Sequence, residues 1–99
     1  MPLPSILPQS MKVLGYQQLA AGAVDASTGL AVPDGTEVAE VAVGAQAVRW
    51  RADGVAPTAA IGQPVPAGTT VVFQLQQLPA LRFISQVAGA SLDVTFYGR

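Results

Sequence analysis

Histidine and cysteine are both absent from the 99-residue chain. Without cysteine there is no disulfide scaffold, no thiolate metal site and no cysteine nucleophile. Without histidine the chain lacks the usual general base at neutral pH and the commonest ligand of transition metals. These two absences predict a protein that is not an enzyme, with no catalytic residues, no bound metal and no cofactor.

Charged side chains are scarce, and neither sign dominates. Five basic and six acidic residues give a formal charge of -1, and they form no run of either sign. Nucleic-acid-binding proteins normally present a basic face, and anionic membranes attract polybasic segments. The composition therefore predicts no direct nucleic-acid partner and no membrane partner. A domain with so few charges is expected to cover much of its surface with protein contacts.

Long apolar runs are also absent, although 51% of the residues are hydrophobic. That fraction is too high for a disordered chain, and no run reaches the ~18 residues of a membrane-spanning helix. The opening MPLPSILPQSMK has no basic residue before its short apolar part, so it does not resemble a signal peptide. The length fits one domain with one core.

Three prolines mark the N-terminal segment, at positions 2, 4 and 8. Each proline fixes its own φ and biases the preceding residue toward extended backbone. We expect residues 1–11 to form an extended arm, whose apolar anchors on a neighbouring subunit are Leu3, Ile6 and Leu7. A frayed terminus is the alternative interpretation. Residues 12–99 are expected to form the single folded domain.

Beyond residue 11 the sequence has the pattern of short β-strands. Apolar runs recur about every ten residues and are bounded by glycine, proline and aspartate, as in all-β sandwiches. A first strand is expected over 12–20, and alternation of apolar and polar residues predicts half-buried strands over 71–76, 81–83 and 92–97. The sequence therefore predicts an all-β fold, an antiparallel β-sandwich of about six to eight strands and of jelly-roll type.

The longest apolar run covers residues 37–53 and has a fault in its alternation. Val43 belongs to one face by parity, whereas Val48 and Trp50 belong to the other. Because a shift of one residue exchanges the two faces of a strand, a bulge or bend is expected over 44–47.

Three glycines are expected to turn the chain between strands. Gly35 and Gly68 each follow a proline by two residues, which suits a turn in which the glycine takes a positive φ. Gly89 is expected to close a hairpin that joins the last two strands. The expected core includes the following side chains: Trp50, Phe73, Phe83, Leu92, Val94 and Phe96.

Two arginines flank the only tryptophan in the stretch VRWRADGVAPTAAIGQP, residues 48–64. By alternation Trp50 faces the core, and Arg49 and Arg51 face outward. Arginine makes forked contacts with carboxylates and is enriched at protein interfaces. The arginines are expected either to pair within the sheet or to contact a partner subunit. Trp50 is expected to anchor the core, with a stacking platform for a sugar or base as the alternative.

Two segments carry a distinctive pattern: AVRWRADGVAPTAAIGQPVPAG over residues 47–68 and ALRFISQVAGASLDVTFYG over residues 80–98. The pattern resembles a family of small virion proteins encoded among the structural genes of tailed bacteriophages. The resemblance extends over residues 12–98, nearly the whole domain. The matching positions are Arg49, Trp50, Arg51, Asp53, Gly54, Pro57, Thr58 and Gly62, followed by Leu81, Arg82, Phe83 and Ile84.

The resemblance implies a capsid decoration, or cement, subunit on the surface of a phage head. Such a subunit would bind and bridge major capsid proteins, self-associate as a dimer or trimer on the shell, and be made in the cytoplasm of the bacterial host. Many copies on a symmetric shell add small contact energies through multivalency. The residues expected at the partner interface are Leu3, Ile6, Leu7, Arg49, Arg51, Asp53, Pro57 and Thr58.

Two other functions stay open on the sequence. A head–tail connector or tail accessory protein of the same virion would also be structural, but it would be present in few copies per particle. A carbohydrate-binding module that aids adsorption would need Trp50 or Tyr97 exposed beside polar side chains.

Overall fold

The computed structural model describes residues 10–99, which form eight β-strands, one short 3-10 helix and the loops between them. The strands are β1 (Lys12–Leu19), β2 (Thr28–Gly29), β3 (Val38–Val43), β4 (Val48–Arg51), β5 (Gln63–Val65), β6 (Thr70–Gln74), β7 (Arg82–Ser85) and β8 (Leu92–Gly98), and the helix η1 covers Leu78–Ala80. Within residues 10–99 there is no α-helix, and no helix there has the length and apolar character needed to cross a membrane. The predicted anchors Leu3, Ile6 and Leu7 lie outside the described residues.

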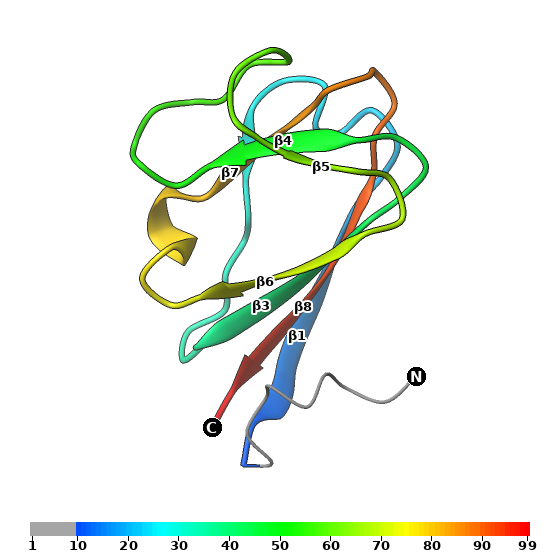
Figure 1. Ribbon diagram of the computed structural model, residues 1–99. Helices are drawn as coiled ribbons and strands as arrows, with labels where there is room; N and C mark the ends of the chain where they lie inside the picture. The colour runs from blue at the N-terminus through cyan, green and yellow to red at the C-terminus, as the bar shows by residue number, and fades with distance from the viewer. Residues whose placement is uncertain (1–9) are drawn as a thin grey trace.

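The strands form two four-stranded antiparallel sheets. One has the order β1-β8-β3-β6 and the other the order β2-β7-β4-β5. In Figure 1 the sheet that contains β4 and β5 lies above the sheet that contains β1 and β8. The prediction of an all-β fold with two antiparallel sheets is therefore confirmed, and the arrangement is that of a β-sandwich.

The hydrophobic core lies between the two sheets because each contributes every second residue of its strands. Phe73 of β6 reaches across the core. Its ring centroid lies 4.9 Å from that of Trp50 at an interplanar angle of 85°, and 5.6 Å from that of Phe83 at 84°. These are edge-to-face contacts, the favoured geometry of aromatic pairs. Trp50 is half-buried, whereas the other predicted core residues, Phe73, Phe83, Leu92, Val94 and Phe96, are buried.

The segment 37–53 forms two strands in different sheets rather than one. β3 ends at Val43, and β4 begins at Val48 in the other sheet. The predicted bend between them is confirmed, and it explains the change of parity, because each strand faces the core from its own side. At the bend Gly44 donates its N–H to the Ser91 carbonyl at 2.9 Å, and the Ser91 side chain occupies the space that a Cβ would need.

Two of the predicted glycine turns are confirmed. Gly35 and Gly68 have φ angles of 84° and 76°. In the first turn Thr36 N donates to the Pro33 carbonyl, and in the second Thr69 N donates to the Pro66 carbonyl, both at 3.3 Å. Glycine suits these positions because other residues rarely adopt such φ angles.

The prediction of a hairpin at Gly89 is wrong. Gly89 does turn the chain, with a φ of 92°, but the turn connects β7 in one sheet with β8 in the other. Asp25 fixes this crossing, because its Oδ1 accepts hydrogen bonds from Gly89 N at 2.9 Å and from Ser85 Oγ at 2.8 Å. The sequence of a glycine turn does not show whether the next strand pairs with the preceding strand or belongs to the other sheet.

Candidate functional site

The loop of residues 52–62 joins β4 to β5 and carries most of the described residues that the sequence predicts at an interface. β4 and β5 pair antiparallel, with Trp50 opposite Gln63 in the register. β5 is an edge strand of its sheet, and Figure 1 shows the loop at one end of the molecule.

Arg49 anchors this loop to the sheet. Its Nε donates to the Ala59 carbonyl at 3.1 Å, and its Nη1 donates to the Gly62 carbonyl at 2.9 Å. The guanidinium thus holds two points of the loop with a rigid fork of donors. Of the two partners that the sequence left open for Arg49, the intramolecular one is present, and a contact with another subunit stays a prediction.

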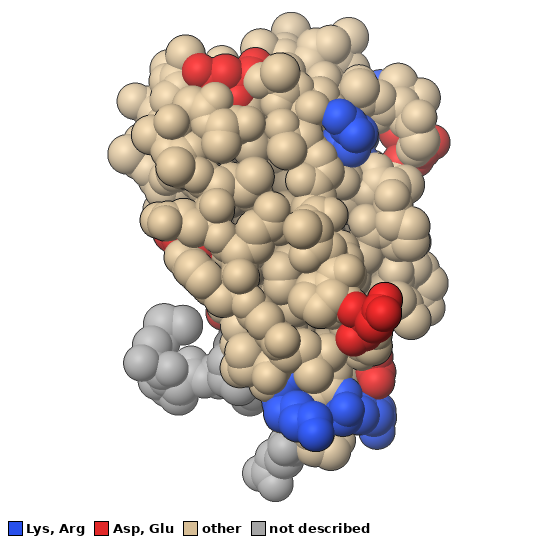
Figure 2. All heavy atoms as spheres, turned by 180° about the vertical axis from the view of Figure 1, so that it is seen from behind, with Lys and Arg blue, Asp and Glu red and all other residues tan. Residues whose placement is uncertain are grey.

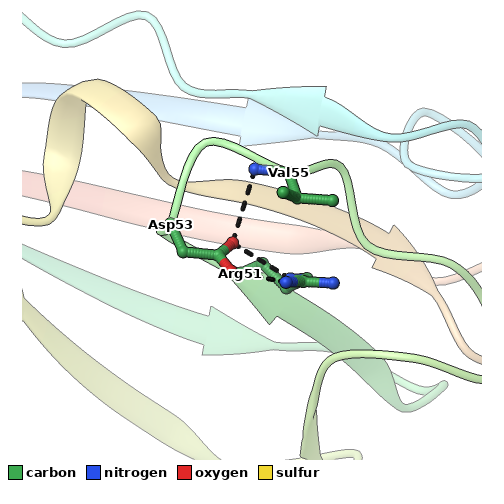
Figure 3. A network of polar contacts seen from close by, with 3 residues as sticks. All are labelled: Arg51, Asp53 and Val55. Carbon is green, nitrogen blue, oxygen red and sulfur yellow. Dashed lines mark hydrogen bonds and ion pairs between the residues drawn. The ribbon is translucent and has the colours of Figure 1, made fainter.

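Arg51 and Asp53 form a forked ion pair at the start of the loop. Arg51 Nε donates to Asp53 Oδ1 at 3.0 Å, and Arg51 Nη2 bonds Asp53 Oδ2. Val55 N also approaches Asp53 Oδ1, at 3.4 Å (Figure 3). The bonds from Arg51 lower the pKa of Asp53 and raise the pKa of Arg51. Both groups are therefore charged at neutral pH, and their charges cancel locally.

The far half of the loop is a tight turn. Thr58 N donates to the Ile61 carbonyl at 2.8 Å, and Thr58 Oγ1 accepts from Ile61 N at 3.0 Å. Pro57 is buried under the turn, while Thr58 is exposed. Side-chain bonds of this kind replace solvent bonds to the backbone and stiffen a loop. The loop therefore presents a fixed surface, in which Thr58 faces solvent and Pro57 supports it.

A cleft of about 510 Å³ opens where this loop leaves β4 and returns to β5. Its lining residues are Trp50, Arg51, Ala52, Asp53, Ile61, Gly62 and Gln63. Trp50 is half-buried and belongs both to the core and to the cleft wall. Ile61 is 58% exposed.

Sequence reasoning singled out Trp50 and Arg51 but missed Ile61 and Gln63. An apolar residue directly after a turn could have pointed to Ile61. Gln63 joins the site only through its register opposite Trp50, and register between strands is set by long-range packing.

Tyr97 does not provide the aromatic platform that a carbohydrate-binding module would need. It is only 2% exposed. Burial raises the pKa of the Tyr97 hydroxyl, and the nearby Glu40 carboxylate adds to the rise. Among the two aromatic candidates, only Trp50 can be reached from a cleft.

Within the part of the chain that the structure describes, no three acidic side chains lie close enough together to hold a metal ion. On the face that Figure 2 shows, charged side chains are few and most of the surface is uncharged. Comparison with protein-family models, with curated proteins and with solved structures found no match to the chain. The function of the site is therefore inferred from its geometry alone. A loop held by hydrogen bonds lies beside a cleft that has apolar walls and one ion pair.

Proposed function

We propose that the chain is a structural protein of a bacteriophage virion, a capsid decoration subunit that binds and bridges major capsid proteins and so stabilises the head. The observation that supports the proposal is the position of the motif that resembles small virion proteins of tailed bacteriophages. Its residues Arg49, Arg51, Asp53 and Thr58 make the bonds that fix the 52–62 loop. The motif therefore encodes a projecting surface of fixed shape.

A fixed loop suits a docking role. Ordering a flexible segment on binding costs free energy, and a loop already held in place avoids that cost. The loop also exposes large apolar side chains, since Val55 is 52% exposed and Ile61 is 58% exposed. Exposed apolar side chains on a projecting, rigid element are typical of protein contact surfaces.

The strand order supports a jelly-roll fold, the finer part of the proposed architecture. The four antiparallel pairs β1·β8, β2·β7, β3·β6 and β4·β5 are all present. Wrapping these four pairs around one core places them alternately in the two sheets, which gives the observed orders. Double-sheet jelly rolls recur in viral capsid domains, and also in lectins.

The proposed subunit works through contact area and copy number, and it needs no catalytic residue, metal or cofactor. It would sit on the capsid surface, bound to the major capsid protein and self-associated as a dimer or trimer. A standard interface buries about 800 Å² on each partner. Weak contacts repeated over a symmetric shell then give a firmly held layer.

Cryo-EM of virions from the genome that encodes the chain tests the proposal. We expect many copies arranged with the symmetry of the head, with the 52–62 loop against the major capsid protein. A few copies confined to one vertex or to the tail would contradict decoration and support the connector or tail-accessory alternative. Removal of residues 2–10, which include Leu3, Ile6 and Leu7, is expected to lower the number of bound copies.

Val55→Asp is a sharper variant than an arginine substitution, because Arg49 and Arg51 also hold the loop itself. We expect Val55→Asp to lower the copy number per particle and to leave the fold intact, as measured by circular dichroism. Val87→Asp is the matched control, because Val87 is 53% exposed and lies on another loop. If Val55→Asp lowers the copy number no more than Val87→Asp does, the loop is not part of the interface.

A further inference from the structure

The cleft beside the 52–62 loop has apolar walls that no element of the described chain covers. Trp50, Ala52 and Ile61 are its apolar lining residues, and Ile61 is exposed. The rings of Trp50 and Phe73 pack edge-to-face, which holds the indole in place. The volume of the cleft, about 510 Å³, falls in the range of small-molecule sites, about 300–1,000 Å³.

Polar groups of both kinds line the same cleft. Arg51 supplies N–H donors, Asp53 supplies carboxylate acceptors, and the amide of Gln63 supplies both. The bonds to Asp53 use Nε and Nη2 of Arg51, and Figure 3 shows the remaining guanidinium nitrogen turned away from the carboxylate. Donors and acceptors thus lie next to one another in a cleft that Trp50 also lines.

The two opposite charges in the cleft lining restrict the charge of a ligand that could bind there. An anion such as phosphate would meet the Asp53 carboxylate, and a cation would meet the Arg51 guanidinium. A purely apolar ligand would displace water from Arg51 and Asp53 without replacing the hydrogen bonds that the water made to them. Such desolvation of charged groups costs free energy. The ligand that fits is neutral, has an apolar face and carries several hydroxyl groups.

We propose that the cleft binds a neutral saccharide. A pyranose ring places its C–H face against Trp50 and Ile61, and its hydroxyls bond Arg51, Asp53 and Gln63. A hydroxyl both donates and accepts, so neighbouring hydroxyls can bridge the carboxylate and the guanidinium without separating them. The arrangement is formed in advance, because Arg49 fixes the loop. The proposal does not rest on the capsid role, although Ile61 belongs to both surfaces.

Trp50 makes the test direct, because it is the only tryptophan in the chain. The full chain is titrated with glucose, galactose, mannose and N-acetylglucosamine, and with the tetrasaccharides of each, while Trp emission is recorded. We expect a saturable change with at least one of these neutral sugars. We expect weaker binding of glucuronate, which differs from glucose by a carboxylate.

Variants locate the binding. Ile61→Ala removes an apolar wall and Gln63→Ala removes one hydrogen-bonding group, and each is expected to raise the dissociation constant about fivefold or more. Val55→Ala is the matched control, because Val55 is similarly exposed on the same loop but does not line the cleft. Thermal unfolding of each variant confirms that the fold is retained.

Three results would overturn the proposal. One is the absence of saturable binding by any of these sugars, checked by calorimetry. Another is binding that Ile61→Ala and Gln63→Ala leave unchanged. A third is loss of particle occupancy in both variants with no sugar bound, which would assign the cleft to a protein partner. Because copy number on virions is measured separately, failure of the saccharide site leaves the decoration role standing.

Discussion

At the scale of single residues, Asp25 shows how a polar side chain joins distant parts of the chain. Its Oδ1 accepts from Gly89 N and Ser85 Oγ, and Val24 O accepts from Ser85 N at 2.7 Å. The loop before β2 is thereby tied to the crossing from β7 to β8. The backbone bond from Gly89, followed by the hydroxyl bond from Ser85, lowers the pKa of Asp25.

This shift predicts a pH dependence of stability. Because the folded pKa of Asp25 is lower than the unfolded one, about 3.9, the ionised group stabilises the fold above the unfolded pKa. The contribution is lost as the pH falls through the folded pKa. Asp25→Asn should therefore lower the unfolding midpoint at pH 7, and the midpoint should fall less steeply below about pH 4 than in the wild type.

Thermal unfolding followed by circular dichroism from pH 2 to pH 7 measures the effect of Asp25→Asn. Asp34→Asn is the control, because Asp34 lies exposed on the turn at Gly35. If both variants shift the midpoint equally across the pH range, Asp25 has no special part in acid unfolding.

Alternation in the sequence predicted the faces of Trp50, Arg49 and Arg51, because strand geometry places neighbouring side chains on opposite sides. It could not predict what Arg49 bonds. The acceptors are carbonyls of Ala59 and Gly62, and main-chain acceptors leave no mark in a side-chain pattern. The charged residues were recognisable, but their partners were not.

At the scale of elements, the 52–62 loop depends on glycine at its exit. Gly62 has a φ of 143°. A Cβ there would lie 3.1 Å from Arg49 Cβ, 3.1 Å from Trp50 O and 3.2 Å from Pro57 Cβ. Both the backbone conformation and the close approach of the loop to β4 therefore favour glycine.

Gly62→Ala is expected to lower the free energy of unfolding by about 1–3 kcal/mol, since a side chain there is strained and crowded. Urea unfolding followed by Trp fluorescence measures the loss. Gly54→Ala separates the two causes, because Gly54 has a φ of 86° but no atom within 4 Å of its would-be Cβ. We expect the smaller loss in Gly54→Ala, and the reverse order would show that crowding at Gly62 does not matter.

Strand positions were more predictable than strand connections. The run 37–53 and the turn at Gly89 both contain a passage from one sheet to the other. Local sequence fixes where a chain bends and which residues are apolar. It does not specify which sheet receives the next strand, because that depends on the total burial of both sheets.

At the scale of the whole molecule, the two sheets meet through a small core. A chain of this size buries only about 60–70% of its unfolded surface, so each large core residue matters. Phe73 is 1% exposed and contacts Trp50 and Phe83 of the opposite sheet. The all-β class was predictable from periodicity. The pairing of β1 with β8, from opposite ends of the sequence, was not.

Phe73→Ala is expected to destabilise the protein by about 3–5 kcal/mol, the usual cost of removing a buried phenylalanine. That loss is a large part of the roughly 5–15 kcal/mol typical of a domain. Chemical unfolding measures it, with Val72→Ala as control, because Val72 is the half-buried neighbour of Phe73 on β6. A loss below about 1 kcal/mol in Phe73→Ala would show that the sheets are held mainly by other contacts.

The pairing of β1 with β8 places Lys12 opposite Gly98, so the start of β1 and the end of β8 lie side by side. Figure 1 shows this end of β8 on the opposite side of the molecule from the 52–62 loop. A cargo protein joined to Arg99 would therefore leave the domain away from the loop. If the loop makes the proposed capsid contact, such a cargo would point into solution.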